Sequence, residues 1–121
     1  MKLRKTFAAL TLGFAVPAVA HADYDVTSEL YICERGAVVP VTYITADSQP
    51  VIAVAVIEGR QIPMFHRTLT GGPVYVAANE QESYRWAPDG DGATLTFLAA
   101  DDSAKEQTIL SQCRRQEQPA E

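Results

Sequence analysis

Short apolar stretches alternate with turn-forming residues along most of the chain, and no stretch after residue 22 shows the 3.6-residue period of an amphipathic helix. Segments with the composition of β-strands are Glu29–Cys33, Val38–Thr45, Val51–Ile57, Gln61–Phe65, Val74–Ala77, Ser83–Ala87, Ala93–Ala99 and Gln107–Cys113. Seven or eight such strands, spaced by about ten residues, are typical of an antiparallel barrel or sandwich. The pattern therefore predicts an all-β domain and is compatible with either architecture.

Two connecting segments and one strand have distinctive patterns. Pro88-Asp89-Gly90-Asp91-Gly92 is the strongest turn signal, and Thr70-Gly71-Gly72-Pro73 reads as a loop. The first also resembles part of a calcium loop, but the strand that begins at Ala93 supplies no further acidic ligands, so a hairpin turn is the better interpretation. Val51–Ile57 is apolar at every position, which predicts a central strand covered on both faces.

The first 22 residues have the composition of a secretory signal peptide. A short basic segment precedes the apolar run Phe7–Val16, and Ala20-x-Ala22 fits a cleavage site, with a cut after Ala20 as the alternative. The apolar run is too short for a membrane-spanning helix, which needs about 20 apolar residues. No cysteine lies near the cleavage site to carry a lipid anchor. We expect export to the periplasm without a membrane anchor.

Cleavage would leave a single domain, residues 23–113, and a flexible polar tail, residues 114–121. The mature chain would keep seven basic and fifteen acidic side chains, a net charge of −8. Like charge disfavours nucleic acid and anionic membranes as partners and favours a basic partner. The alternative interpretation is that the acidity only keeps the protein soluble.

Cys33 and Cys113 both remain after cleavage, and an isolated pair in an oxidising compartment predicts a disulfide. The sequence contains neither a Gly-x-Ser-x-Gly elbow nor a phosphate-binding loop. His66 is the only imidazole that we expect to lie within the domain, and a single His beside Phe65 favours packing over catalysis. We therefore expect a non-enzymatic protein with no metal and no cofactor.

Several short motifs occur in a recognisable order along residues 29–113. They are Tyr31-Ile32-Cys33, a Val-rich strand with Tyr43, Gly72-Pro73-Val74-Tyr75, Tyr84-Arg85-Trp86, Gly-Asp-x-Ala-Thr-Leu from Gly90 to Leu95, and Cys113. Each motif alone is weak, but their order and spacing resemble the bacterial inhibitors of c-type lysozyme known as the MliC and PliC family. Without a lipid-anchoring cysteine, the chain looks more like the soluble periplasmic branch.

The resemblance implies an antiparallel eight-stranded barrel closed by the disulfide. It also implies a loop, Gly71–Tyr75, that enters the lysozyme active-site cleft and a second contact from the Asp89–Gly92 turn. The implied partner-binding residues are Thr70, Gly71, Gly72, Pro73, Tyr75, Asp89, Gly90 and Asp91. Members of the family can pair as homodimers, and no feature of this sequence decides whether this chain does.

Two positions depart from the family pattern. The family has Ser where this chain has Gly71, and Lys where it has Asp89. Asp89 would bring like charge to the catalytic carboxylates of lysozyme. Two alternatives therefore stay open: a binding module on the same fold with another envelope or host protein as its target, and a barrel that holds a small apolar ligand.

Overall fold

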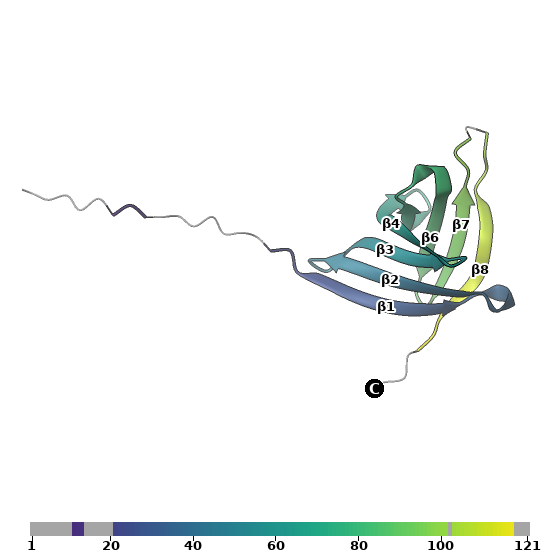
Figure 1. Ribbon diagram of the computed structural model, residues 1–121, viewed down its shortest axis with the longest axis horizontal. Helices are drawn as coiled ribbons and strands as arrows, with labels where there is room; N and C mark the ends of the chain where they lie inside the picture. The colour runs from purple at the N-terminus through teal and green to yellow at the C-terminus, as the bar shows by residue number, and fades with distance from the viewer. Residues whose placement is uncertain (1–10, 14–20, 102, 118–121) are drawn as a thin grey trace, which may run out of the picture.

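The computed structural model describes residues 11–13, 21–101 and 103–117. The predicted signal peptide lies almost entirely outside the described residues, as does the end of the tail. Eight antiparallel strands form a closed barrel in the order of the sequence (Figure 1). They are β1 (Tyr24–Ile32), β2 (Val38–Ala46), β3 (Gln49–Ile57), β4 (Arg60–Leu69), β5 (Gly72–Ala77), β6 (Ser83–Asp89), β7 (Gly92–Leu98) and β8 (Gln107–Arg115). The all-β prediction is confirmed, and the architecture is the barrel.

Two short 3₁₀ turns interrupt the succession of strands, η1 (Glu34–Gly36) between β1 and β2 and η2 (Glu80–Glu82) before β6. None of the helical segments in the described ranges is long and apolar enough to cross a membrane.

Tight hairpin turns set the register of the first strands. Asp47 and Ser48 connect β2 to β3 with φ angles of 50° and 64°, and Glu58 and Gly59 connect β3 to β4 with 52° and 76°. Positive φ at both central residues is the geometry of the two-residue turn that matches the twist of a β-hairpin. Ala46 pairs with Gln49 across the first of these turns.

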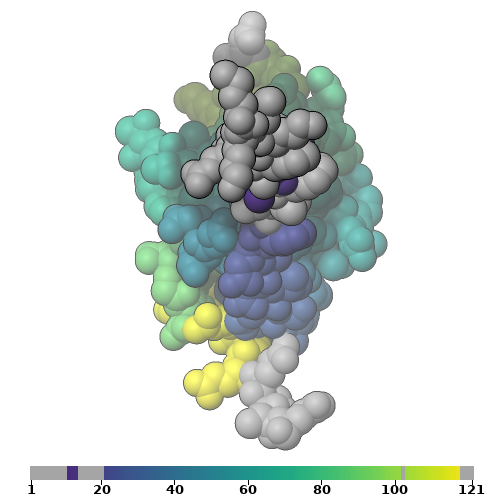
Figure 2. Space-filling model, turned by 90° about the vertical axis from the view of Figure 1, so that its left-hand side faces the viewer, coloured from purple at the N-terminus to yellow at the C-terminus, as the bar shows by residue number. Residues whose placement is uncertain are grey.

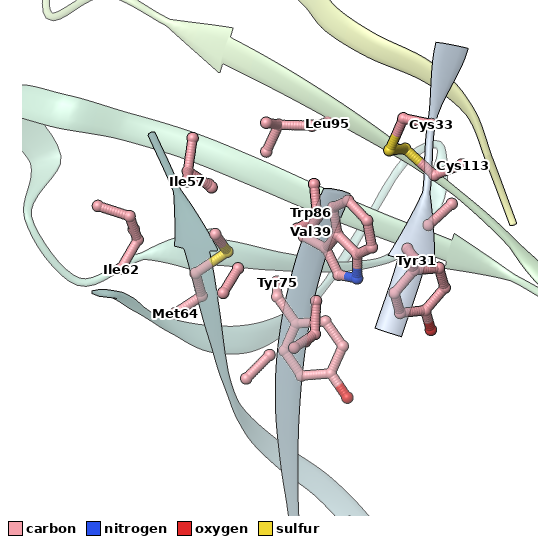
Figure 3. Close-up of a cluster of buried hydrophobic side chains, with 14 of the residues drawn as sticks. Tyr31, Cys33, Val39, Ile57, Ile62, Met64, Tyr75, Trp86, Leu95 and Cys113 are labelled. Carbon is pink, nitrogen blue, oxygen red and sulfur yellow. A yellow bond between two sulfur atoms is a disulfide. The ribbon is translucent and has the colours of Figure 1, made fainter. Parts of the chain in front are cut away.

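The core fills the inside of the barrel. Trp86, Met64 and Leu95 are completely buried, and side chains from β1 to β5 surround them (Figure 3). Buried and half-buried residues alternate along β3, and Ala53 and Ala55 face the inside of the barrel. Their neighbours on the outer face are only half-buried, so the prediction of a strand covered on both faces is wrong. A closed barrel has one inner face, and β-branched residues on the outer face reflect strand propensity as well as burial.

The barrel closes through a short ladder between its first and last strands. Among the described residues, the strand partners between β1 and β8 are limited to Tyr31 with Arg115 and Ile32 with Arg114. The last strand thus runs two residues beyond its predicted end at Cys113, because these two arginines make the closing pairs. The disulfide between Cys33 and Cys113 lies next to this closure and links positions 80 residues apart.

The first strand begins at Tyr24, five residues before its predicted start at Glu29. Its N-terminal part pairs only with β2 among the described residues, and it runs along the surface in Figure 2. The polar residues between Tyr24 and Glu29 concealed this strand, since they do not form an apolar stretch.

Candidate functional site

The predicted loop and the predicted turn lie at the same end of the barrel. Between β5 and β6, Tyr75 pairs with Trp86 and Val76 with Arg85. Because the strands are antiparallel, the start of β5 at Gly72 and the end of β6 at Asp89 both point towards that end. The ladder stops after these two pairs, so the two strands separate as they approach the hairpin tip and the turn.

The loop is the tip of the β4–β5 hairpin, which we call the hairpin tip and define as Thr70–Pro73. Leu69 pairs with Gly72, and Thr70 and Gly71 make the turn. Gly72 has a φ of 113°, which disfavours any residue with a side chain. Gly71 is different, since a Cβ atom there would meet nothing within 4 Å and its φ is not in the positive range.

A hollow of about 570 Å³ lies beside the hairpin tip. It extends over the outer side of β6 to the segment before β8, and its lining residues are Thr68, Leu69, Thr70, Gly71, Gly72, Pro73, Val74, Arg85, Ala87 and Glu106. Arg85 lies 4.0 Å from Glu106 between Nη1 and Oε2. Its Nε is buried and has no hydrogen-bond partner among the described residues. Sequence reasoning missed Arg85 as part of this surface.

A second hollow, of about 220 Å³, adjoins the first at Ala87. It is lined by Ala87, Asp89, Gly92, Ala93, Thr94, Gln112, Cys113 and Arg114. The hairpin tip and the turn therefore border two hollows that share Ala87 in their lining. Arg114 was also missed, because its position after the last predicted strand assigned it to the tail.

The β6–β7 turn is a tight hairpin, as predicted. Asp89 pairs with Gly92, and Gly90 takes a φ of 59° between them. Arg115 fixes the turn, since its Nη2 lies 2.6 Å from Oδ1 of Asp91 and its backbone N donates to the Asp91 carbonyl at 2.8 Å. In the described part of the chain, no three His, Cys, Asp or Glu residues gather to hold a metal ion.

Tyr75, on the β5 strand of this hairpin, lies inside the barrel and anchors the hairpin to the core. It is only 5% exposed and lies in the core cluster (Figure 3). Its ring centroid lies 5.5 Å from that of Tyr43 and 5.2 Å from that of His66. Burial raises the pKa of the Tyr75 hydroxyl above its usual value. The other predicted site residues are exposed, half-buried at the surface, or border one of the two hollows, so Tyr75 is the one that belongs to the core.

Packed aromatic side chains extend from Tyr75 through the core towards the disulfide. Tyr43 Oη accepts a hydrogen bond from Trp86 Nε1 at 2.7 Å and forms another with Tyr31 Oη at 2.8 Å. The Tyr31 and Trp86 rings meet edge to face with centroids 4.9 Å apart. Burial, reinforced by the bond with Tyr31, raises the pKa of Tyr43 far above its usual value. The strands β5 and β6, which carry the hairpin tip and the turn, are therefore both anchored in one aromatic cluster, formed by Tyr31, Tyr43, Tyr75 and Trp86.

Comparison with solved structures gives two similar chains. The periplasmic inhibitor of C-type lysozyme from Salmonella typhimurium, PliC-St, is 23% identical with a TM-score of 0.60, over 76% of this chain and 99% of its own. The Adhesin Complex Protein from Neisseria meningitidis is 22% identical with a TM-score of 0.47, over 76% and 99%. No curated protein sequence matches this chain. At these identities the structural likeness to PliC-St concerns the fold.

The family comparison reaches further than the fold. Residues 31–104 match the family model described as membrane-bound lysozyme-inhibitor of c-type lysozyme. This range contains the hairpin tip, the β6–β7 turn and the aromatic residues Tyr31, Tyr43, Tyr75 and Trp86. Since the model covers more than half of the chain, the protein belongs to the MliC family of c-type lysozyme inhibitors.

Proposed function

We propose that this protein inhibits c-type lysozyme by placing the hairpin tip in the active-site cleft, with the Asp89–Gly92 turn as a second contact. The observation that carries the proposal is the pairing of Tyr75 with Trp86, which directs both segments to one end of the barrel. Membership of an inhibitor family supplies the target class. A non-enzymatic role follows, since blockade needs contact and no chemistry.

The hairpin tip has the shape that entry into a cleft requires. Gly71 and Gly72 carry no side chains, and no atoms lie within 4 Å of the positions where Cβ atoms would stand. A glycine backbone can approach a partner more closely than any other. The buried Tyr75 holds the hairpin in place before binding, and such preorganisation lowers the entropy lost on association.

Charge supports the same partner. We propose export to the periplasm with removal of residues 1–22, which leaves a domain of net charge −8. An acidic protein is steered towards a basic one, which raises the association rate. Local charge at the site is mixed, because Arg115 neutralises Asp91 and Arg114 lines the same hollow as Asp89. The repulsion expected between Asp89 and the catalytic carboxylates of lysozyme is therefore offset in part by the neighbouring cation, Arg114.

Titration of lysozyme activity tests the proposal. Residues 23–121 are added to a c-type lysozyme, and the rate of cell-wall lysis should fall to zero at one inhibitor per enzyme when both exceed the dissociation constant. Gly71→Trp should remove inhibition, because the site tolerates a side chain but the widened tip no longer fits a cleft. Val26→Trp adds the same bulk at an exposed position on β1, which β2 and β3 separate from the hairpin of β4 and β5, and it should inhibit normally.

A binding module with another protein target is the second candidate. It is favoured by Gly71 and Asp89, which stand where the family has Ser and Lys. Full lysozyme activity at high inhibitor concentration would support it. A ligand inside the barrel has less support, because Trp86, Met64 and Leu95 already fill the interior.

A further inference from the structure

Three arginines lie near the two hollows, and two of them already face acidic side chains. Arg115 is engaged by Asp91 at 2.6 Å and by Glu29 at 3.9 Å. Arg85 faces Glu106 at 4.0 Å, with its side chain only 22% exposed. A third hollow on its other side is lined by two more acidic residues, Glu80 and Asp101. Neither guanidinium is well placed to take a further anion.

Arg114 differs from both. It lies on β8 opposite Gly92, it is exposed, and no ion pair among the described residues involves it. Its Nη1 lies 3.7 Å from the position where a Cβ of Gly92 would stand, so the guanidinium lies against the bare backbone of the turn. The charge of Arg114 is therefore presented beside the second predicted contact.

The backbone of β8 is shaped to place this side chain. Gln112 has a φ of 53°, in the left-handed region, and the pairing with β7 shifts register between Ala93 and Leu95. Such a bulge redirects the side chains that follow it, and bulges and backbone strain concentrate near functional sites. After the bulge, Cys113 points into the core, where the disulfide fixes it, and Arg114 points outwards.

We propose that Arg114 binds one of the two catalytic carboxylates of lysozyme when the hairpin tip occupies the cleft. This inference rests on the proposed function. Glycosidases of the lysozyme type carry two carboxyl groups that flank the bond to be cleaved, so the cleft of this basic enzyme holds acidic groups. A guanidinium can donate two parallel hydrogen bonds to a carboxylate, which an ammonium cannot do.

Affinity measurements with matched variants test the role of Arg114. Arg114→Gln should weaken binding to lysozyme by about tenfold to a hundredfold, because a charge-assisted hydrogen bond is lost. The affinity of Arg114→Lys should lie between those of the wild type and Arg114→Gln, since lysine keeps the charge but cannot donate two parallel hydrogen bonds. Arg60→Gln is the control, because it removes the same charge from an exposed arginine that lines neither hollow and pairs with Glu82 at 2.9 Å. Its affinity should change little.

A double-mutant cycle identifies the partner group. Each catalytic carboxylate of lysozyme is changed to the amide, and Arg114→Gln should then cost almost nothing against one of the two enzymes. Arg114 also pairs with Ile32 at the barrel closure, so the unfolding transition of each variant is compared with that of the wild type.

The outcomes separate the inference from the proposed function. If the wild type inhibits and Arg114→Gln binds equally well, or its cost is the same against both amide variants, the role of Arg114 is refuted and the inhibitor proposal stands. If the wild type neither binds nor inhibits lysozyme, the proposed function fails and this inference fails with it.

Discussion

Trp86 and Tyr43 are 43 residues apart in the sequence and are joined by a hydrogen bond of 2.7 Å from the indole Nε1 to the phenol oxygen. Trp86 is also the residue of β6 that pairs with Tyr75 of β5. The hydrogen bond thus connects the wall of the barrel on β2 to the two strands that carry the hairpin tip and the turn. Disturbing it should affect stability directly and the site indirectly.

Tyr43→Phe should destabilise the fold by about 1–3 kcal/mol, because the buried indole N–H loses its acceptor. Chemical denaturation at neutral pH measures the loss. Tyr84→Phe is a suitable control, since the Tyr84 ring packs against Phe97 on a half-exposed part of the surface. A Tyr43→Phe protein with wild-type stability would show that the network contributes nothing.

The same cluster predicts how stability depends on pH. Burial raises the pKa of Tyr43 in the folded protein, and that of Tyr31 as well. The folded state therefore holds these protons more tightly than the unfolded state, whose tyrosines titrate near pH 10. Stability is complete below about pH 10 and falls as the pH rises further. The fall should be shallower in Tyr43→Phe, and equal slopes in both proteins would contradict this account.

The sequence allowed much of the fold to be predicted because most strands are apolar and their turns carry Gly, Asp or Pro. The prediction failed where polar residues form a strand, as between Tyr24 and Glu29, because pairing with β2 overrides composition there. It also failed for Arg114 and Arg115, since barrel closure depends on residues far apart in the sequence. Glycines predicted the loop and the turn as connections between strands, and the family resemblance indicated them as a candidate site. Nothing local indicates that Tyr75 is buried or that Arg114 lies beside Gly92.

The disulfide should contribute a large part of the stability. Cys33 and Cys113 are separated by 80 residues, and the loop-entropy model gives roughly 4.5 kcal/mol for a loop of that size. Replacing both cysteines with Ala should lower the free energy of unfolding by up to this amount. The denaturation midpoint of the oxidised wild type gives the reference, and an unchanged midpoint in the variant would refute the estimate.

Association with lysozyme should depend on salt if the acidity serves recognition. Raising the ionic strength to 0.15 M shortens the screening length to about 8 Å, which weakens steering between oppositely charged proteins. We expect the association rate to fall markedly from low to physiological salt, while the dissociation rate changes less. Stopped-flow mixing measures both. An association rate that is independent of salt would show that the negative charge serves only solubility.

Restoring the two family residues should strengthen inhibition. Gly71→Ser with Asp89→Lys supplies a hydroxyl and a cation to the carboxylates of the cleft, and Gly71 has room for the side chain. A charge-assisted hydrogen bond contributes roughly 1.5–3 kcal/mol, or about a tenfold to hundredfold drop in the dissociation constant. Asp89→Asn is the control that removes repulsion without adding a cation. Weaker binding by the double variant would indicate a different pose.

The kinetic mode of inhibition tests cleft blockade most directly. Lysozyme is assayed with a soluble oligosaccharide substrate at several concentrations of the inhibitor. If the hairpin tip occupies the cleft, substrate and inhibitor exclude each other, so the apparent KM should rise with inhibitor concentration while kcat stays constant. A fall in kcat at unchanged KM would mean that the protein binds lysozyme away from the cleft, and it would contradict the proposed mechanism.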